Sequence, residues 1–306
     1  MSRFVRFEQF GGPEVLSVVN VEPPRPGPGQ VRVQVRVAGL NPVDHKIFAG
    51  GPTAEKHGAR LPSGVGNDFS GIVDQVGEGV TSLRPGDAVF GGARHRAQAD
   101  FVVVDADRVL RKPERLTIEQ AGALDISGRA AWATVQAVRV AADDTVLVSA
   151  AAGGVGLLAC QLALATGATV IGTASLRNHD FLRSIGVVPV EYGEGLAERV
   201  RDASRGRVTA VLDYNGAETI DAGLALGVHG SRINTIVARG HASEHGIGGV
   251  GGQAASLDNL LELAELIAGG SIVLPIDSVF PIQRVAEAYT RLSLGHTRGK
   301  SILVTE

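Results

Sequence analysis

The 306-residue chain has one cysteine, Cys160, and a formal net charge of only −3. A single cysteine excludes an intrachain disulfide and a cysteine-rich zinc knuckle, and it fits a reducing cytoplasm. The small net charge gives no support for nucleic acid or an anionic membrane as a partner. The sequence also lacks an uninterrupted apolar run of about 18 residues, which excludes a plain membrane-spanning helix. We therefore expect a cytoplasmic protein that acts on a small molecule, without a nucleic-acid or membrane partner.

The first third of the chain predicts a β domain. Short runs that are rich in Val or alternate in polarity, at 31–40, 71–77 and 99–111, are separated by turns rich in Gly and Pro. Such short strands pack most simply as a compact barrel-like domain. The chain is also long for one domain, since a typical domain has roughly 150 residues.

From about residue 117 the pattern changes to strands that alternate with helices. The strand-like runs TVLVSA, TVIGTAS and VTAVLDY are separated by helix-like segments at 153–166, 178–186 and 194–204. This alternation predicts a parallel doubly wound sheet. The tail does not continue the repeat, and we expect it to rejoin the first domain. The predicted fold is α/β, with one domain at 1–118 completed by 271–306 and a second at 119–270.

A glycine cluster, SAAAGGVG at 149–156, follows the first strand of this repeat. Aligned to the dinucleotide fingerprint GxGxxG, Ala151, Gly153 and Gly156 take the three glycine positions. A glycine at 153 lets backbone N–H groups approach a pyrophosphate, and a glycine at 156 lets the helix pack tightly on the strand. The strand before the cluster and the helix after it favour a nucleotide cradle over the alternative, a simple tight turn.

The end of the second strand bears on which nucleotide is bound. A site for NAD carries Asp or Glu about 20 residues beyond the glycines, where it binds the ribose 2′-hydroxyl. The segment TASL at 173–176 has no carboxylate, whereas Ser175 and Arg177 suit a 2′-phosphate. NADPH is therefore favoured over NADH. The alternative is that Arg177 is a solvated residue at the start of the next helix.

Another candidate site is GHASEHG, where His241 and His245 are four residues apart. Two histidines at this spacing on one helix could bind a metal ion. The nearby glycines argue against a helix here, so the sequence favours two surface histidines. No metal ligand is predicted.

Six motifs, spread over nearly the whole chain, together resemble the medium-chain dehydrogenase/reductase superfamily. They are GLNPVDHK (39–46), GNDFSGIVDQVGEGVTSLRPGDAVFG (66–91), AAAGGVG (150–156), VIGTASLRN (170–178), VLDYNGAETI (211–220) and GHTRGKSIL (295–303). The resemblance is specifically to the zinc-free quinone oxidoreductase branch, related to zeta-crystallin, and Ala151 in the first glycine position points the same way. It implies a GroES-like catalytic domain, a Rossmann domain, an active-site cleft between them, and a homodimer.

The resemblance also implies which residues would bind the cofactor. The pyrophosphate cradle would consist of Ser149, Ala150, Ala151, Gly153, Gly154, Val155 and Gly156. The other contacts would be Ser175 and Arg177 to the 2′-phosphate, Tyr192 to the adenosine, Asn215 and Gly216 to the ribose, Ile236 and Val237 to the nicotinamide carboxamide, Lys300 near the carboxamide end, and Asn41 facing the nicotinamide and substrate. For Tyr192 a core aromatic that closes a loop is an equal alternative.

Zinc-dependent alcohol dehydrogenases of the superfamily carry Cys where Asn41 stands and a His-Glu pair where Asn67 and Asp68 stand. The resemblance therefore implies that catalytic zinc is absent. The loop ALDISGRAAW (123–132) departs from the branch's ALPLAGLTAW at Asp125, Arg129 and Ala130, which leaves the substrate open. Phe48 could supply an apolar wall for the substrate.

Without a metal ion to polarise an alcohol, reduction of an electron-poor acceptor is favoured. Hydride transfer from NADPH then needs mainly positioning and a proton. Asn41 is the candidate for orienting the nicotinamide or the carbonyl, although an Asn before Pro42 can also be a turn residue. Asp44 and His45 could supply the proton, or Asp44 could brace the loop.

Three functions remain open at this point. The leading hypothesis is an NADPH-dependent quinone reductase. The second is a reductase of 2-enoyl or alkenal double bonds, including one that acts on a carrier-bound acyl chain. The third is an NADPH-binding protein without physiological turnover.

Overall fold

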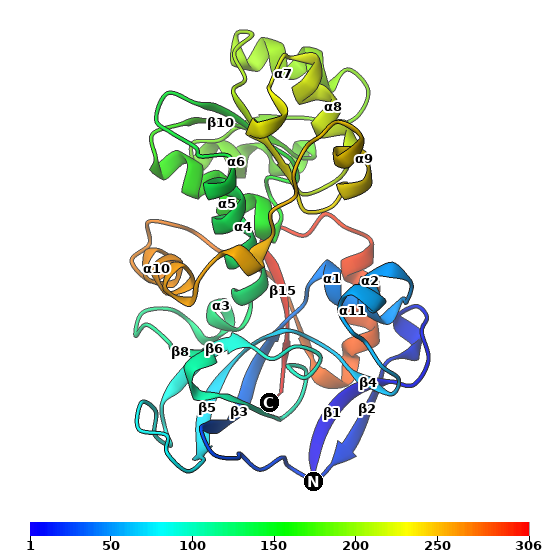
Figure 1. Cartoon of the computed structure of the whole chain (residues 1–306), viewed down its shortest axis with the longest axis vertical. Coiled ribbons are helices and arrows are strands. Elements are labelled where there is room, and N and C mark those ends of the chain that lie inside the picture. Colours follow the sequence, from blue (N-terminus) through cyan, green and yellow to red (C-terminus); the bar gives the residue numbers. More distant parts are fainter. Residues whose placement is uncertain (306) are drawn as a thin grey trace. The chain divides into compact units, whose positions relative to one another are not determined.

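The computed structural model describes residues 1–305, which fold into two compact units. The first unit comprises residues 1–126, 261–271 and the chain from 275 on, and the second comprises 127–260 and 272–274 (Figure 1). The sequence places the first boundary at 118/119, whereas the units divide after residue 126. The reason is that helix α3 (Ile118–Gly122) packs on strands of the first unit.

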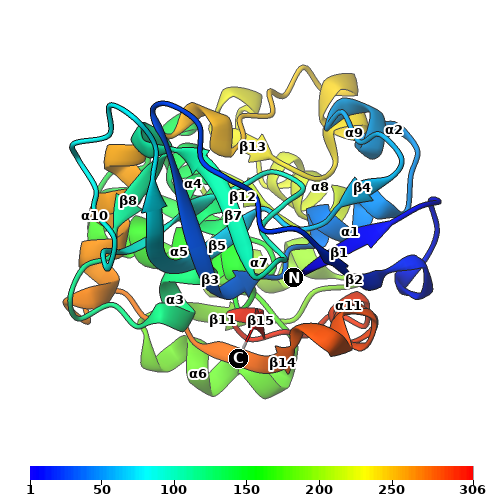
Figure 2. The same ribbon diagram turned by 90° about the horizontal axis from the view of Figure 1, so that it is seen from below.

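The first unit is built on a seven-stranded sheet with the order β14-β15-β3-β5-β6-β8, in which β7 also pairs with β3. Its longest strand, β3, buries every second residue, as the alternating sequence VRVQVRV predicts. The last strand, β15, pairs antiparallel with β3 and parallel with β14, beside helix α11 (Figure 2). The strands are β3 (Gln30–Gly39), β5 (Asp68–Val76), β6 (Ala88–Gly92), β7 (Phe101–Asp105), β8 (Val109–Arg111), β14 (Ile276–Pro281) and β15 (Lys300–Val304).

A smaller sheet completes the strands of this unit, with β1 between β2 and β4. The strand run expected at 99–111 is broken in two by a 3₁₀ turn at Ala106–Arg108. The smaller sheet consists of β1 (Ser2–Phe7), β2 (Ser17–Val21) and β4 (Ser63–Gly64), and the helices of the unit are α1 (Pro42–Phe48), α2 (Pro52–Lys56), α3 and α11 (Val285–Ser293). Further 3₁₀ turns lie at Pro13–Val15 and Ile282–Arg284.

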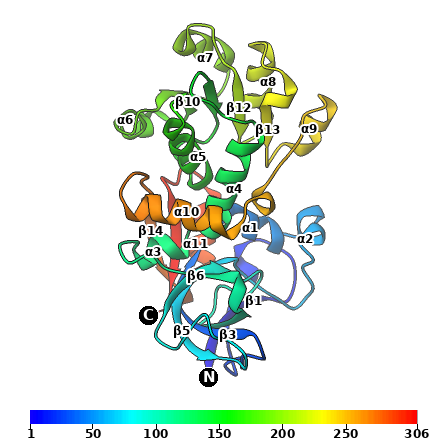
Figure 3. The same cartoon turned by 60° about the vertical axis from the view of Figure 1, so that its left-hand side comes forward.

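The second unit has a five-stranded sheet, wholly parallel, with the order β11-β10-β9-β12-β13 and helices around the strands (Figure 3). The central strand β9 is buried along its whole length, as expected for a parallel strand covered on both faces. The strands are β9 (Thr145–Val148), β10 (Thr169–Thr173), β11 (Val188–Val190), β12 (Ala210–Asp213) and β13 (Ile233–Thr235). The strand order reverses between β9 and β12, where ligands bind in doubly wound sheets. The predicted α/β fold class is confirmed.

The helices of the second unit follow the expected alternation in part. The sequence predicted those that correspond to α5, α6 and α7, but it did not predict α8 or α9. The helices are α4 (Asp125–Ala137), α5 (Gly154–Ala165), α6 (His179–Ser184), α7 (Leu196–Ser204), α8 (Ala217–Ala225) and α9 (Arg239–Glu244). Helix α10 (Leu257–Ala268) includes the division of the two units at 260/261, and 3₁₀ turns lie at Leu176–Asn178, Gly230–Arg232 and Gly252–Ala254.

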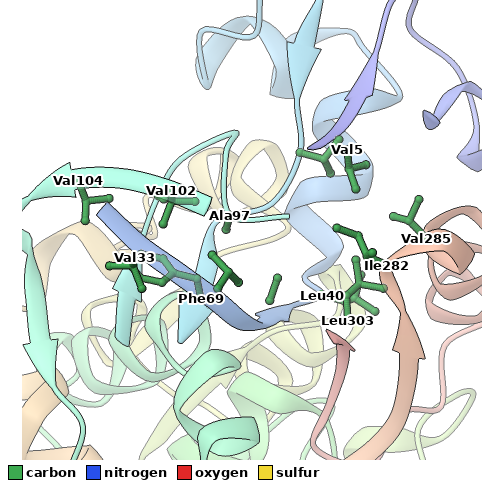
Figure 4. Close-up of a cluster of buried hydrophobic side chains, with 14 of the residues drawn as sticks. Val5, Val33, Leu40, Phe69, Ala97, Val102, Val104, Ile282, Val285 and Leu303 are labelled. Atoms are coloured by element: carbon green, nitrogen blue, oxygen red, sulfur yellow. The ribbon is translucent and has the colours of Figure 1, made fainter. Parts of the chain in front are cut away.

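The core of the first unit joins the large sheet to α1 and α11. Figure 4 shows Phe69 of β5 among valines of β3 and β7, with Leu303 of β15 and Val285 of α11 in the same cluster. Beside them the ring of Phe48 packs edge-on against Tyr289, with ring centroids 5.0 Å apart, and neither side chain is exposed. Burial of such large apolar side chains is the main favourable term in folding. It fixes α1, and therefore the segment Asn41–Asp44, against the sheet.

Candidate active site

The turn from β9 into α5 forms a cradle of backbone N–H groups. Gly153 is the N-cap of α5, and no side chain caps the helix or places a carboxylate in its first turn. The first N–H groups of a helix have no partner within the helix, and they carry the positive end of its dipole. Ala150 stands at φ 48°, which turns the chain sharply between strand and helix. An uncapped helix start of this kind is suited to bind a phosphate group.

The two glycines of the cradle differ in what surrounds them. A Cβ atom at Gly156 would lie 2.3 Å from the carbonyl oxygen of Ala150, so only glycine lets α5 approach β9 this closely. A Cβ atom at Gly153 would meet only that same oxygen, at 3.3 Å. The chain therefore crowds position 153 less than position 156, and the absence of a side chain at Gly153 leaves space for a ligand.

One buried carboxylate, that of Asp213 at the end of β12, organises the neighbouring loops. Its Oδ1 accepts hydrogen bonds from the Ser149 hydroxyl at 2.9 Å and from the N–H groups of Asn215 and Gly216 at 3.0 and 2.9 Å. The Ser149 hydroxyl in turn accepts from the N–H of Tyr214 at 2.7 Å. Asp213 thus joins the loops after β9 and β12, on either side of the point where the strand order reverses.

The second oxygen of Asp213 reaches the loop after β13. Asp213 Oδ2 accepts from the Thr235 hydroxyl at 2.6 Å, and that hydroxyl accepts from the N–H groups of Val237 and Ala238, both at 3.0 Å. Ser149, Asn215, Gly216 and the segment of Ile236 and Val237 therefore belong to one hydrogen-bonded arrangement. Sequence reasoning missed Asp213 itself, although a carboxylate directly after the buried run AVL was a usable signal.

The loop after β10 holds the residues expected at the 2′-phosphate. Ser175 precedes the 3₁₀ turn Leu176–Asn178, and Arg177 is exposed within it. The loop is tied to the cradle because the N–H of Ala151 donates to the carbonyl of Thr173 at 3.0 Å. Tyr192 is 46% exposed, so the alternative that it is a core aromatic is wrong.

The first unit contains a cluster of buried polar side chains around Asn41. The Asn41 amide donates to Asp68 Oδ2 at 3.0 Å and accepts from the Lys300 ammonium at 2.5 Å. Lys300 also pairs with Asp68 at 3.6 Å, and both side chains are almost completely buried. Burial lowers the pKa of Lys300, and the neighbouring carboxylates of Asp68 and Asp44 oppose this shift. The side chains of Asp68 and Lys300 thus hold the amide plane of Asn41 in one orientation.

Asp44 extends this cluster toward the core. Its carboxylate accepts from the Asn67 amide at 2.5 Å and from the backbone N–H of Asn41 at 3.0 Å, which caps the start of α1. Burial and the nearby charge of Asp68 raise the pKa of Asp44 to about 7. The Tyr289 hydroxyl also bonds to Asp44, and it accepts from the Gln98 amide at 2.6 Å. These contacts support the expected role of Asp44 in bracing the loop.

A cavity of about 440 Å³ lies in the second unit, lined by Val138, His229, Asn234 and His245 among others. None of the predicted cofactor residues lines it. None of the helices in residues 1–305 is long and apolar enough to cross a bilayer.

Comparison with known proteins places this arrangement in a family. Residues 27–142 match the alcohol dehydrogenase GroES-like domain, and residues 187–303 match a family described as zinc-binding dehydrogenase. The quinone oxidoreductase of Pseudomonas aeruginosa is 30% identical over 99% of this chain and 100% of its own length. The chain belongs to the medium-chain dehydrogenase/reductase superfamily, in its quinone oxidoreductase branch.

Solved structures of the superfamily agree with this assignment. The quinone oxidoreductase of Coxiella burnetii superimposes with a TM-score of 0.89 at 31% identity and covers 100% of this chain and 99% of its own. The Escherichia coli quinone oxidoreductase complexed with NADPH gives a TM-score of 0.86 at 28% identity, over 99% of this chain and 100% of its own.

A mycocerosic acid synthase-like polyketide synthase of Mycobacterium tuberculosis is 32% identical over 91% of this chain but only 14% of its own length.

The zinc ion named in one family description does not fit the residues present. At the positions where zinc-dependent members of the superfamily carry Cys and His-Glu, this chain has Asn41, Asn67 and Asp68. In the structure the ammonium group of Lys300 donates a hydrogen bond to Asn41 and pairs with the carboxylate of Asp68. An amide and a single carboxylate that are held by a lysine cation are a poor donor set for zinc, which prefers thiolate and imidazole.

The structure corrects the expected role of Phe48 and shows the surroundings of two departures from the superfamily pattern. Phe48 is not available as an apolar wall for a substrate, because its side chain is wholly buried between Phe7 and Tyr289. Arg129 does not stand as an isolated charge, because its guanidinium donates to the carbonyl of Ala255 at 2.9 and 3.2 Å. Ala130, the next residue, is buried, so the alanine at this position contributes to the packing of α4.

The raised pKa of Asp44 predicts a pH dependence of stability. Between pH 3.8, the ordinary pKa of the side chain, and about 7, native Asp44 holds a proton that the unfolded chain has released. This group therefore makes the free energy of unfolding fall as the pH rises through that range. Replacing Asp44 with Asn should remove that contribution, which urea unfolding followed by circular dichroism at a series of pH values would measure.

Asp107→Asn is the matched control, because Asp107 is an exposed carboxylate of the same unit. It should keep the pH slope of the unsubstituted protein. The slope is the informative quantity, since Asn at position 44 also loses a hydrogen bond and lowers stability at every pH. Equal slopes for all three proteins would contradict the assignment.

Proposed function

We propose that this chain is an NADPH-dependent oxidoreductase that reduces quinones by hydride transfer without zinc. The observation that carries the proposal is the cradle of backbone N–H groups at the start of α5. Asp213 joins the loop that forms this cradle to the loop after β12. The quinone oxidoreductase relatives, and the NADPH bound to the Escherichia coli protein of similar fold, support it. A cytoplasmic location and a homodimer are further parts of the proposal.

The cofactor would use the second unit along the edge where its parallel strands end. The uncapped start of α5 would receive the pyrophosphate, and Ser175 with Arg177 would hold the 2′-phosphate of the adenosine ribose. Asn215 and Gly216 would border the other ribose, and the segment after Thr235 would meet the carboxamide. NADPH supplies the hydride when bound, and these residues bind and orient it.

Asn41 and Lys300 would act on the nicotinamide and the substrate carbonyl. The amide of Asn41 carries two N–H bonds, and the hydrogen bond to Asp68 uses one of them. The second is the donor that we assign to the substrate oxygen, held in direction by Lys300 and Asp68. A quinone already accepts electrons readily, so hydride transfer needs positioning and one hydrogen-bond donor rather than a Lewis acid, and a proton from solvent completes the hydroquinone.

The second candidate is reduction of a 2-enoyl or alkenal double bond. It is favoured by the similarity to a stretch of a polyketide synthase. NADPH would again supply the hydride, and the Asn41 amide would again donate a hydrogen bond to the substrate carbonyl. Only the substrate that accepts the hydride would differ. A third candidate is an NADPH-binding protein without turnover.

A panel of acceptors distinguishes these candidates. The purified protein should oxidise NADPH in the presence of 1,4-naphthoquinone, followed as the loss of absorbance of the reduced nicotinamide under anaerobic conditions. Crotonyl thioesters and alkenals are the comparison substrates. Turnover of the enoyl compounds alone would refute quinone reduction, and NADPH binding without oxidation by any acceptor would favour the third candidate.

Replacing Arg177 with Ala tests the choice of cofactor. Loss of a charge-assisted hydrogen bond to the 2′-phosphate should weaken NADPH binding by about 1.5–3 kcal/mol, roughly ten- to a hundredfold, and leave NADH binding nearly unchanged. Fluorescence titration with each nucleotide would measure this.

Arg183→Ala serves as the control, because Arg183 is an exposed arginine on α6 that pairs with Asp180. It should bind both nucleotides like the unsubstituted protein. Equal losses of NADPH and NADH affinity in Arg177→Ala would refute the role of Arg177 at the 2′-phosphate.

A further inference from the structure

Three potential metal ligands meet on one surface of the second unit. Asp221 lies on α8, His241 lies on α9, and His245 directly follows α9. One ligand atom from each lies within 4.8 Å of the other two. Helices α8 and α9 lie near each other (Figures 1 and 3), and residues of the two helices are in contact. The sequence placed the two histidines four residues apart, but only the fold brings a carboxylate to them.

The three side chains already interact in a way that orders them. His241 Nε2 lies 2.6 Å from Asp221 Oδ1, and the rings of His241 and His245 meet edge to face with centroids 4.9 Å apart. Zinc bonds to nitrogen and oxygen are near 2.1 Å, so two ligand atoms of a tetrahedral site are about 3.4 Å apart. Small side-chain movements would therefore turn this cluster into a three-ligand site, in which the metal replaces the hydrogen bond between His241 and Asp221.

We propose that Asp221, His241 and His245 bind a divalent zinc ion. Two imidazoles and one carboxylate suit zinc, whereas magnesium and calcium prefer oxygen ligands alone. The side chains of Asp221 and His241 are 55% and 29% exposed, so an ion can enter from solvent, and water can complete its coordination. The site is separate from the polar cluster of the first unit, where the residues do not fit zinc.

The position of the site gives the ion a structural effect. Helix α8 begins directly after Asn215 and Gly216, and α9 begins directly after the loop that Thr235 holds. An ion that joins Asp221 to the two histidines would link the helices that follow two of the loops joined by Asp213. Zinc binding should therefore stabilise the folded second unit, because an ion that binds only the native state raises its stability.

Isothermal titration of the tag-free protein with zinc chloride, together with thermal unfolding, tests the proposal. We expect one zinc ion per chain and an unfolding temperature that rises with zinc but not with the same concentration of magnesium. The variants Asp221→Asn, His241→Gln and His245→Gln should each weaken zinc binding more than about tenfold, since even partners outside the ligand shell change metal affinity by that factor. Their unfolding temperatures without zinc show whether each variant is folded.

Glu244→Gln is the matched control, since Glu244 is an exposed carboxylate on the same helix that lies outside the cluster. It should bind zinc with the affinity of the unsubstituted protein. Absence of zinc binding would overturn the proposal. Zinc binding that persists unchanged in both histidine variants would also overturn it, because the ion would then be held elsewhere.

Discussion

The buried carboxylate of Asp213 is the interaction on which the cofactor cradle depends. Its two oxygens accept hydrogen bonds from the loops that follow β9 and β12 and from Thr235, the last residue of β13, which in turn holds the loop after that strand. A buried charge is costly unless it is fully hydrogen-bonded, and here the hydrogen-bond donors come from the loops themselves. The same bonds that satisfy the carboxylate therefore fix the positions of the loops. The glycines provide space at the cradle, and Asp213 holds its walls in place.

The first unit also contains buried charged and polar side chains that bond to one another. Asp68, Lys300 and Asn41 are buried together and bond to one another, so removal of Asp68 or Lys300 would leave the other charge without its closest counter-ion. The lysine supplies a positive charge beside Asn41 and Asp68, two positions where zinc-dependent members of the superfamily carry Cys and Glu. Burial and the neighbouring charge of Asp68 raise the pKa of Asp44 to about 7, although Lys300 opposes this shift.

The sequence predicted most of the fold because its signals are local. The buried run TVLV, the glycines of 153–156 and the apolar face of the next helix all lie within one stretch of chain and specify β9 and α5. The pairing of Lys300 with Asn41 joins residues 259 positions apart, which no periodicity reveals, and only the resemblance brought both to attention. Asp213 was overlooked because its role depends on the order of the strands. Helix α9 was missed because Gly240 within it and the glycines that follow it are unfavourable for a helix, and its contact with α8 overrides that preference.

The affinity for NADPH of the protein with Asp213 replaced by Asn is the measurement that tests the central claim most directly. The amide keeps the size of the side chain but loses the charge and the second acceptor, so the loops after β12 and β13 lose their common anchor. The account predicts that NADPH binds at least about tenfold more weakly to this variant, which remains folded by circular dichroism, since one hydrogen bond to a charged group contributes about 1.5–3 kcal/mol. NADPH affinity equal to that of the unsubstituted protein would contradict it.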